Sequence, residues 1–278
     1  MTTPDLAQSH SLTVSVVLHH SELRHLRTTV TSLVRAAQVA NVKPRLVVVD
    51  HSLDDNYSHG ARSLIESLWP ELGNIAFYVA ADNRGYGSGH NRAFETGLGD
   101  IHLVLNPDVA LDERALAQGL ETLALDDSIA LLAPLSLDEN GREEHLAKAM
   151  PSVSVLALRA FGPDCLKRRF ARSLARYECH DLPREGDPHD ITLASGCCML
   201  IRGESLRRVT GFNEAFFLYF EDYDLSLRLA NHGRICRDPN MIIRHYGGDA
   251  ARKGWRHIVW FIASGVRFFN RWGWRFSG

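Results

Sequence analysis

The sequence predicts an α/β protein built on one Rossmann-like, mixed but mostly parallel sheet with helices on both faces. Short β-branched runs alternate with stretches of helical spacing from Thr13 to Leu105, and this alternation is typical of parallel strands joined by right-handed crossovers. Three polar residues, Asp50, Asn83 and Asp108, fall at or just beyond strand ends. In open sheets of this kind, ligands bind beyond the carboxyl ends of the strands.

The periodicity gives the expected elements in chain order. We expect strands over residues 13–18, 45–49, 75–80, 101–105, 129–134 and 241–243. We expect helices over residues 23–40, 59–69 and 88–97, the second of them stopped by Pro70. Residues 191–201 have a core-like composition, whereas residues 151–190 break the pattern.

Composition excludes several classes of protein. The 278 residues suit one large domain, and a net charge of −2 gives no global basic field for nucleic acid. Neither a signal peptide nor an apolar run of membrane-spanning length is recognisable. The five cysteines are an odd number without a CxxC pair, which predicts reduced thiols in a cytoplasmic protein, with Cys197 and Cys198 as small buried side chains.

The segment 217–228 is the most informative part of the chain. Glu221, Asp222 and Asp224 place three carboxylates within four residues among aromatic and aliphatic side chains. Such surroundings raise the pKa of a carboxyl group and suit it to act as a general base. The alternative is a helix start, where acids are favoured by the helix dipole, with Asp224 and Arg228 paired on one helix face.

Four other motifs accompany this segment. They are Val47-Val48-Val49-Asp50, the glycine-rich segment 83–91, Leu103-Val104-Leu105-Asn106-Pro107-Asp108-Val109, and His245-Tyr246-Gly247-Gly248. The glycine-rich segment lacks the Gly-Lys-Ser/Thr of a Walker loop. Its three glycines allow the backbone to approach a ligand or to adopt a positive φ angle. Taken alone, Asp50 and Asp108 could each cap a turn.

In this order, over roughly residues 12–250, the five motifs resemble family 2 glycosyltransferases, and most of all the bacterial rhamnosyltransferase-type members that build surface polysaccharides. The resemblance implies a GT-A fold. It divides the chain into a flexible N-terminus (1–11), a nucleotide-binding half (12–110), an acceptor and catalytic half (111–250), and a C-terminal amphipathic helical extension (251–278).

The resemblance also implies roles for individual residues. The expected contacts to the nucleotide and diphosphate are Asp50, Ser52, Asn83, Gly85, Gly87, Asn91, Asn106, Arg252 and Lys253. Asp108 and His245 are expected to bind a divalent cation, Mg²⁺ or Mn²⁺. The chain departs from the family pattern at His51, which replaces an Asn, at Asn106, which replaces the first acid of Asp-x-Asp, and at Asn213 in Gly211-Phe212-Asn213-Glu214. The loss of the first acid puts the strength of metal binding in doubt.

The resemblance implies an inverting transfer. Asp222, with Glu221 as the second choice, is expected to deprotonate an acceptor hydroxyl that attacks the anomeric carbon of a nucleotide-sugar. The implied donor is dTDP-L-rhamnose, and the implied acceptor is a growing glycan, lipid-linked or free, at the inner face of a membrane.

Two other functions stay open on the residues alone. A non-catalytic nucleotide-sugar or glycan-binding protein would not need the acids at 221 and 222. A nucleotidyltransferase would need a glycine-rich basic loop after the first strand, where residues 18–22 contain no glycine. The basic-apolar stretch 156–176 and the aromatic tail 255–276 either contact a membrane surface or pack on the domain as amphipathic helices. Monomer and homodimer are both compatible with the sequence.

Overall fold

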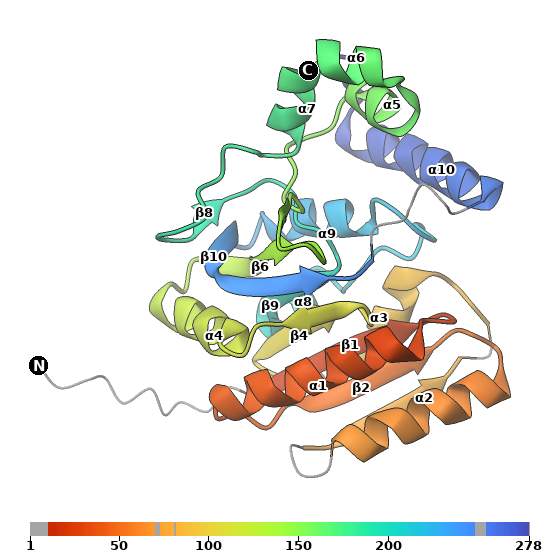
Figure 1. The fold of residues 1–278 in the computed structure, drawn as a ribbon, viewed down its shortest axis with the longest axis vertical. Coiled ribbons are helices and arrows are strands. Elements are labelled where there is room, and N and C mark those ends of the chain that lie inside the picture. Colours follow the sequence, from red (N-terminus) through yellow and green to blue (C-terminus); the bar gives the residue numbers. More distant parts are fainter. Residues whose placement is uncertain (1–10, 70–72, 81, 248–253, 278) are drawn as a thin grey trace, which may run out of the picture.

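The computed structural model describes residues 11–69, 73–80, 82–247 and 254–277, and its centre is a ten-stranded sheet (Figure 1). The strands are β1 Leu12–Leu18, β2 Arg45–Asp50, β3 Ile75–Val79, β4 Ile101–Leu105, β5 Val109–Leu111, β6 Ile129–Leu137, β7 Glu143–Glu144, β8 His189–Asp190, β9 Cys198–Arg202 and β10 Arg234–His245. The main path of the sheet runs β3-β2-β1-β4-β9-β6-β10-β5.

The first four strands of this path are mutually parallel. Strand β9 is antiparallel to both of its neighbours, β6 and β10 are parallel, and β5 is antiparallel to β10. The chain moves outward from β1 to β3 and then returns to place β4 on the other side of β1. The sheet is therefore mixed, as predicted, and its switch point lies between β1 and β4, where open sheets bind ligands.

Helices cover both faces of the sheet. They are α1 Leu23–Val39, α2 Asp55–Leu68, α3 Tyr86–Glu95, α4 Ala115–Leu125, α5 Val153–Phe161, α6 Asp164–Arg169, α7 Ala171–Tyr177, α8 Gly203–Arg208, α9 Glu221–Leu229 and α10 Trp255–Trp272. Helices α1, α2 and α4 share one apolar core with the sheet, and α8 and α9 share a second core with it. Helices α5, α7 and α10 form a third cluster around Phe216 and Phe220, and Figure 1 shows these helices gathered with α6 at one end of the molecule.

Most predicted elements are confirmed, with shifted bounds. Helix α2 begins at Asp55, four residues earlier than expected, because the side chain of Asp54 accepts a hydrogen bond from the Tyr57 amide at 3.0 Å and caps the helix. The strand expected at 241–243 is the end of the longer β10, whose register shifts between Asp238 and Ile242. Pro239 lies in this irregular stretch, and a proline that interrupts a strand pattern hides the strand from sequence analysis.

Helix α4 and strand β5 were not predicted, although their residues are strongly apolar. All five cysteines are free, and Cys197 and Cys198 are buried as expected. In the part of the chain that the structure describes, no helix is both long enough and apolar enough to cross a bilayer.

A chain of buried polar side chains lies between β1, β4 and α3. The hydroxyl of Thr13 lies 2.6 Å from Nδ1 of His102, whose Nε2 lies 2.8 Å from the hydroxyl of Ser15. Ser15 in turn lies 2.7 Å from Nδ1 of His90. Burial lowers the pKa of His102 to about 3 and that of His90 well below its ordinary value. Both imidazoles are therefore neutral in the folded protein.

These neutral histidines predict a stability that depends on pH. Below a pH of about 6.5 these histidines bind protons in the unfolded chain but not in the folded chain. The free energy of unfolding should therefore fall by up to ~1.4 kcal/mol per pH unit for each histidine. Urea denaturation between neutral pH and pH ~5 measures this slope. His102→Asn should make it shallower, and the same substitution at exposed His59 should leave it unchanged. An unaltered slope in His102→Asn would contradict the assignment.

Candidate active site

The predicted catalytic acids open helix α9. Asp222 accepts two backbone hydrogen bonds, from the Gly196 amide to Oδ2 at 3.0 Å and from the Tyr223 amide to Oδ1 at 2.9 Å. Glu221 is only 5% exposed, and its Oε2 has no hydrogen-bond partner among the described residues. Asp222 is less deeply buried than Glu221.

The two carboxyl groups differ in how readily they ionise. Burial, reinforced by the charge of Asp222, raises the pKa of Glu221 well above its ordinary value. Burial also raises the pKa of Asp222, but the amides of Gly196 and Tyr223 oppose this shift because they stabilise the carboxylate. Asp222 is therefore the better placed of the two to carry the charge and accept a proton.

The backbone just before these acids is strained. Tyr219 and Phe220 have φ angles of 72° and 65°, in the left-handed region that non-glycine residues rarely occupy. Helix α10 holds the segment in place. The Ser264 hydroxyl donates to the Leu218 carbonyl at 2.8 Å, and the ring of Phe220 packs against Phe261 and Phe268. The aromatic tail is thus partly a structural support for the site.

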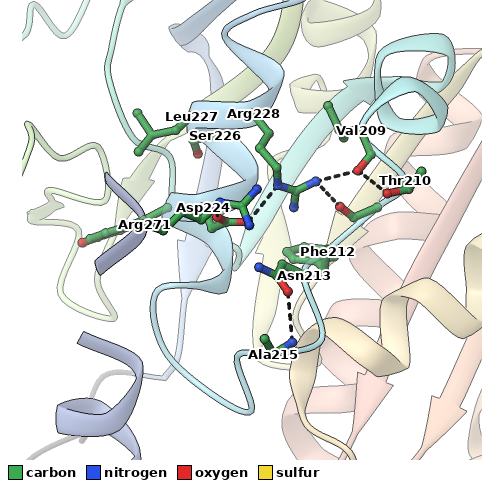
Figure 2. A network of polar contacts seen from close by, with 12 residues as sticks. Val209, Thr210, Phe212, Asn213, Ala215, Asp224, Ser226, Leu227, Arg228 and Arg271 are labelled. Carbon is green, nitrogen blue, oxygen red and sulfur yellow. Dashed lines mark hydrogen bonds and ion pairs between the residues drawn. The ribbon is translucent and has the colours of Figure 1, made fainter. Parts of the chain in front are cut away.

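Asp224 is the third acid of the run, and its role is structural. Its side chain is fully buried and forms ion pairs with Arg228 at 2.8 Å and with Arg271 of α10 at 3.1 Å. Arg228 also donates to the carbonyls of Val209 and Gly211, at 2.6 and 2.7 Å (Figure 2). The predicted pairing of Asp224 with Arg228 is confirmed, and the network ties α9 to α10 and to the 209–211 turn.

The Gly196 peptide connects the acids to the rest of the site. Its amide donates to Asp222, and its carbonyl accepts from the Tyr86 hydroxyl at 2.6 Å. The next carbonyl, that of Cys197, accepts from the Asn106 amide at 2.8 Å. Tyr86 is partly buried, and burial followed by the nearby Cys197, Glu221, Asp222 and Asp108 raises its pKa. Tyr86 and Asp222 belong to motifs more than 130 residues apart in the sequence, and both bind the Gly196 peptide.

Asp108 and His245 come together because β5 and β10 are antiparallel neighbours, with His245 opposite Val109. Nε2 of His245 lies 3.6 Å from Oδ1 of Asp108, and Nδ1 lies 2.9 Å from Oε2 of Glu144 on β7. Burial alone would lower the pKa of His245, but these two carboxylates outweigh burial and raise it to about 9. Sequence analysis missed Glu144, because no local pattern links it to a histidine 101 residues away.

This arrangement fits a divalent cation that is only partly held by protein. Glu144 orients the ring of His245 and leaves Nε2 toward Asp108, as a carboxylate commonly does for a metal-binding histidine. No cluster of three or more His, Cys, Asp or Glu side chains suited to a metal occurs among the described residues. A cation here would need further oxygen ligands, which the phosphates of a bound substrate commonly provide for Mg²⁺.

The side chains predicted to contact the nucleotide near the end of β2 already form hydrogen bonds within the protein. Asp50 is 0% exposed, its Oδ1 accepts from the Ser52 amide at 2.9 Å, and its Oδ2 accepts from the Ser58 hydroxyl at 2.5 Å. Ser52 accepts from the His20 amide at 2.8 Å. Asn83 accepts from the Gly85 amide and lies 3.2 Å from His51. A base contact through Asp50 would have to share an oxygen that is already in use.

The glycine-rich segment is explained by packing within the chain. A Cβ atom at Gly85 would lie 2.0 Å from the Phe217 carbonyl, and one at Gly87 would lie 2.8 Å from the Phe212 side chain. Asn91 is engaged as well, because its amide group donates to Phe212 and Glu214 and accepts from the Phe212 amide. These residues join α3 to the 212–217 segment, which leads to Glu221 and Asp222, and the ligand contacts expected of them stay predictions.

Two clefts border these residues. One, of about 540 Å³, is lined by Asp108 and His245 together with Asp138, Glu139 and the start of α1. The other, of about 370 Å³, is lined by His51, Arg84 and Ser88. Asn106 has a buried Oδ1 without a partner among the described residues. Arg252 and Lys253 lie outside the described residues, so their predicted contacts to diphosphate stay predictions.

Comparison with known proteins supports the predicted resemblance. The chain is 27% identical over 172 residues to an N-acetylglucosaminyl-diphospho-decaprenol L-rhamnosyltransferase of Mycobacterium tuberculosis, matching 58% of this chain and 54% of that protein. It is 23% identical over 164 residues to the low-salt glycan biosynthesis hexosyltransferase Agl10 of Haloferax volcanii, matching 58% and 48%. The chain thus spans about half the length of these curated relatives. No protein-family model matches it.

Among solved structures, the chain is similar to a mannosyltransferase of Pyrobaculum calidifontis in complex with GDP-mannose and Mn²⁺. The TM-score is 0.64 at 18% identity, over 95% of this chain and 66% of that one. At this identity the similarity shows the fold. The chain has the GT-A fold that the sequence predicted.

The buried ion pairs of Asp224 predict a large loss of stability when its charge is removed. Asp224→Asn leaves Arg228 and Arg271 without their anion, so the free energy of unfolding should fall by about 3 kcal/mol. Urea denaturation followed by circular dichroism measures the change. The matched control is Asp127→Asn, because the side chain of Asp127 is 96% exposed, and it should alter stability by less than about 0.5 kcal/mol. Similar losses in both variants would contradict the role given to Asp224.

Proposed function

We propose that this protein transfers a sugar from a nucleotide-sugar to a hydroxyl group of a glycan, with inversion at the anomeric carbon. The observation that carries the proposal is the geometry of Asp222, a partly buried residue at the start of α9 whose carboxylate is held by two amides beside the buried Glu221. The similarity to a rhamnosyltransferase and a hexosyltransferase supports the same reaction class.

In the proposed reaction, Asp222 accepts the proton of the acceptor hydroxyl as its oxygen forms a bond to the anomeric carbon. The bond between that carbon and the diphosphate oxygen breaks on the opposite side, and its electrons leave with the nucleoside diphosphate. A single displacement of this kind inverts the configuration. The amides of Gly196 and Tyr223 fix the carboxylate in place before the substrate arrives.

The proposed donor site uses Asp108 and His245 to hold a divalent cation, Mg²⁺ or Mn²⁺, against the diphosphate. When bound, such an ion neutralises charge on the leaving group. The cleft itself favours this proposal, because its lining includes the carboxylates of Asp108, Asp138 and Glu139, whereas its one arginine, Arg24, pairs with Glu22. A diphosphate would be repelled by these groups unless a cation lay between them. Asn106, whose Oδ1 has no partner within the residues that the structure describes, is proposed to contribute a neutral oxygen nearby.

We further propose L-rhamnose from dTDP-L-rhamnose as the transferred sugar and a lipid-linked glycan of the bacterial envelope as the acceptor. The support is the relative at 27% identity, whose name specifies an L-rhamnosyltransferase that acts on a decaprenol-linked sugar. A donor panel distinguishes this sugar from mannose, which accompanies GDP in the similar mannosyltransferase structure.

The donor site can be tested by ligand-induced stabilisation. With Mg²⁺ or Mn²⁺ present, dTDP and dTDP-rhamnose at about 100 times their dissociation constants should stabilise the protein by about 2.7 kcal/mol. Thermal unfolding against a panel of nucleoside diphosphates measures the shift. Chelation by EDTA and the Asp108→Ala variant should both reduce it, whereas Asp127→Ala should not. If no nucleotide stabilises the protein with or without metal, the donor-site assignment is wrong.

The base can be tested by separating binding from turnover. Asp222→Asn keeps a group of nearly the same shape but cannot accept the proton, so turnover should fall by at least about a hundredfold while the nucleotide-induced stabilisation is retained. Release of nucleoside diphosphate in the presence of an acceptor measures turnover. Asp127→Asn, at a side chain that is 96% exposed, serves as the control. Nucleotide binding in the wild type without turnover on any acceptor would indicate a binding protein instead.

A further inference from the structure

The exposed apolar side chains gather on one part of the molecule. We call residues 153–177 and 254–277, which form α5, α6, α7, α10 and the C-terminal tail, the helical cap. Of fifteen large apolar side chains that are exposed in the described residues, ten belong to the helical cap. A soluble monomer rarely collects exposed apolar side chains in one region unless that region binds something.

Half of these ten side chains form a stripe along α10. They are Trp255, Ile258, Val259, Ile262 and Val266, each between 43% and 71% exposed. Their spacing of three, four, seven and eleven residues from Trp255 places them on one face of a helix. The side chains of Ser264, Phe268 and Phe269 turn to the buried side and pack against the protein. The exposed stripe is therefore distinct from the side of α10 that faces the core.

The helical cap is also strongly basic, whereas the rest of the chain is acidic. Residues 153–177 and 254–277 contain ten Lys and Arg residues and one acid, Asp164, which leaves twenty-one Lys and Arg residues against thirty-two acids elsewhere. Arg168, Arg169 and Arg172 are exposed next to Leu166 and Phe170. Figure 1 shows α5, α6 and α10 at the same end of the molecule. Apolar and cationic side chains thus gather at the same end of the molecule.

We propose that the helical cap is a membrane-docking surface for bilayers that contain anionic lipids, with α10 lying along the headgroup region. An amphipathic helix with aromatic and aliphatic residues beside arginines binds such surfaces by burying its apolar face and pairing its charges with headgroups. A second copy of the chain is disfavoured as the occupant, because symmetric pairing would bring two cationic caps together.

The proposal also concerns the acceptor, and this part rests on the proposed function. Helix α10 contacts the 217–220 segment that leads directly to Glu221 and Asp222, through Ser264 with Leu218 and through Trp260 with Phe217. A cap bound to the bilayer would therefore hold the catalytic acids close to the headgroups. An acceptor anchored by a lipid could reach Asp222 without leaving the membrane.

The test is flotation of the full chain with vesicles in the absence of any nucleotide. We expect the protein to float with vesicles of phosphatidylglycerol and phosphatidylcholine in equal parts and to remain unbound with phosphatidylcholine alone. The double variant Ile258→Ser/Ile262→Ser should weaken binding by at least about tenfold, since each substitution removes apolar groups worth ~0.8 kcal/mol per CH₂. Arg168→Glu/Arg169→Glu should weaken it by a similar factor.

The controls use the same substitutions elsewhere. Leu125→Ser replaces an apolar side chain that is 76% exposed on α4, and Arg35→Glu reverses an exposed charge on α1. Neither should alter binding. The proposal is overturned if wild-type protein does not float with anionic vesicles, if it floats equally well with neutral ones, or if the cap variants bind like the controls. It is also overturned if the wild type forms a dimer that the Ile258→Ser/Ile262→Ser variant dissolves.

Nucleotide-induced thermal stabilisation of the same variants separates this proposal from the proposed function. Cap variants that lose vesicle binding should keep their response to nucleotide and metal, because the substituted side chains lie outside the donor site. A wild type that floats with anionic vesicles but shows no response to any nucleotide would leave the docking surface standing and remove the proposed transferase activity.

Discussion

The buried carboxylate of Asp224 is the constraint on which the arrangement of the site depends. An unpaired charge is costly in a protein interior, so the fold must bring cations to it. It does so from α9 itself, through Arg228, and from α10, through Arg271, while the indole of Trp272 donates a hydrogen bond at 3.0 Å. These contacts fix α9 relative to α10. Because Glu221 and Asp222 lie within the same helical turn as Asp224, fixing the helix also fixes them.

The site has its own energetic costs, which this framework must offset. Tyr219 and Phe220 occupy left-handed backbone conformations, and Glu221 is buried with one oxygen that finds no partner in the described part of the chain. Each of these features destabilises the folded state by about 1–3 kcal/mol. The compensating contacts come from α10 and α5 through the aromatic cluster around Phe220 and Phe268. Sites whose local structure is unfavourable commonly depend on rigid elements elsewhere in this way.

The sequence was informative where a residue's role is set by its neighbours in the chain. The β-branched run of β1 and the strand ends at Asp50 and Leu105 were predicted because period and turn chemistry are local. Roles that depend on long-range contacts were missed. Glu144 reaches His245 only because β7 and β10 both lie beside β6. The ligand contacts expected of Gly85 and Gly87 stay predictions, but their tight packing against residues 212 and 217, more than 120 positions away, leaves no local signal in the sequence.

Helix α10 shows how one segment can serve two requirements without conflict. Its inward side chains, Ser264 and Phe268, support the strained turn before Glu221 and Asp222, and its outward side chains, Ile258 and Ile262, remain exposed. A helix needed only for support would gain nothing from an apolar outer face, which carries a risk of aggregation. A helix needed only for surface binding would not require the buried contacts to Leu218 and Phe220. The presence of both faces therefore argues that the support of the active site and the binding of an external surface were combined in one element.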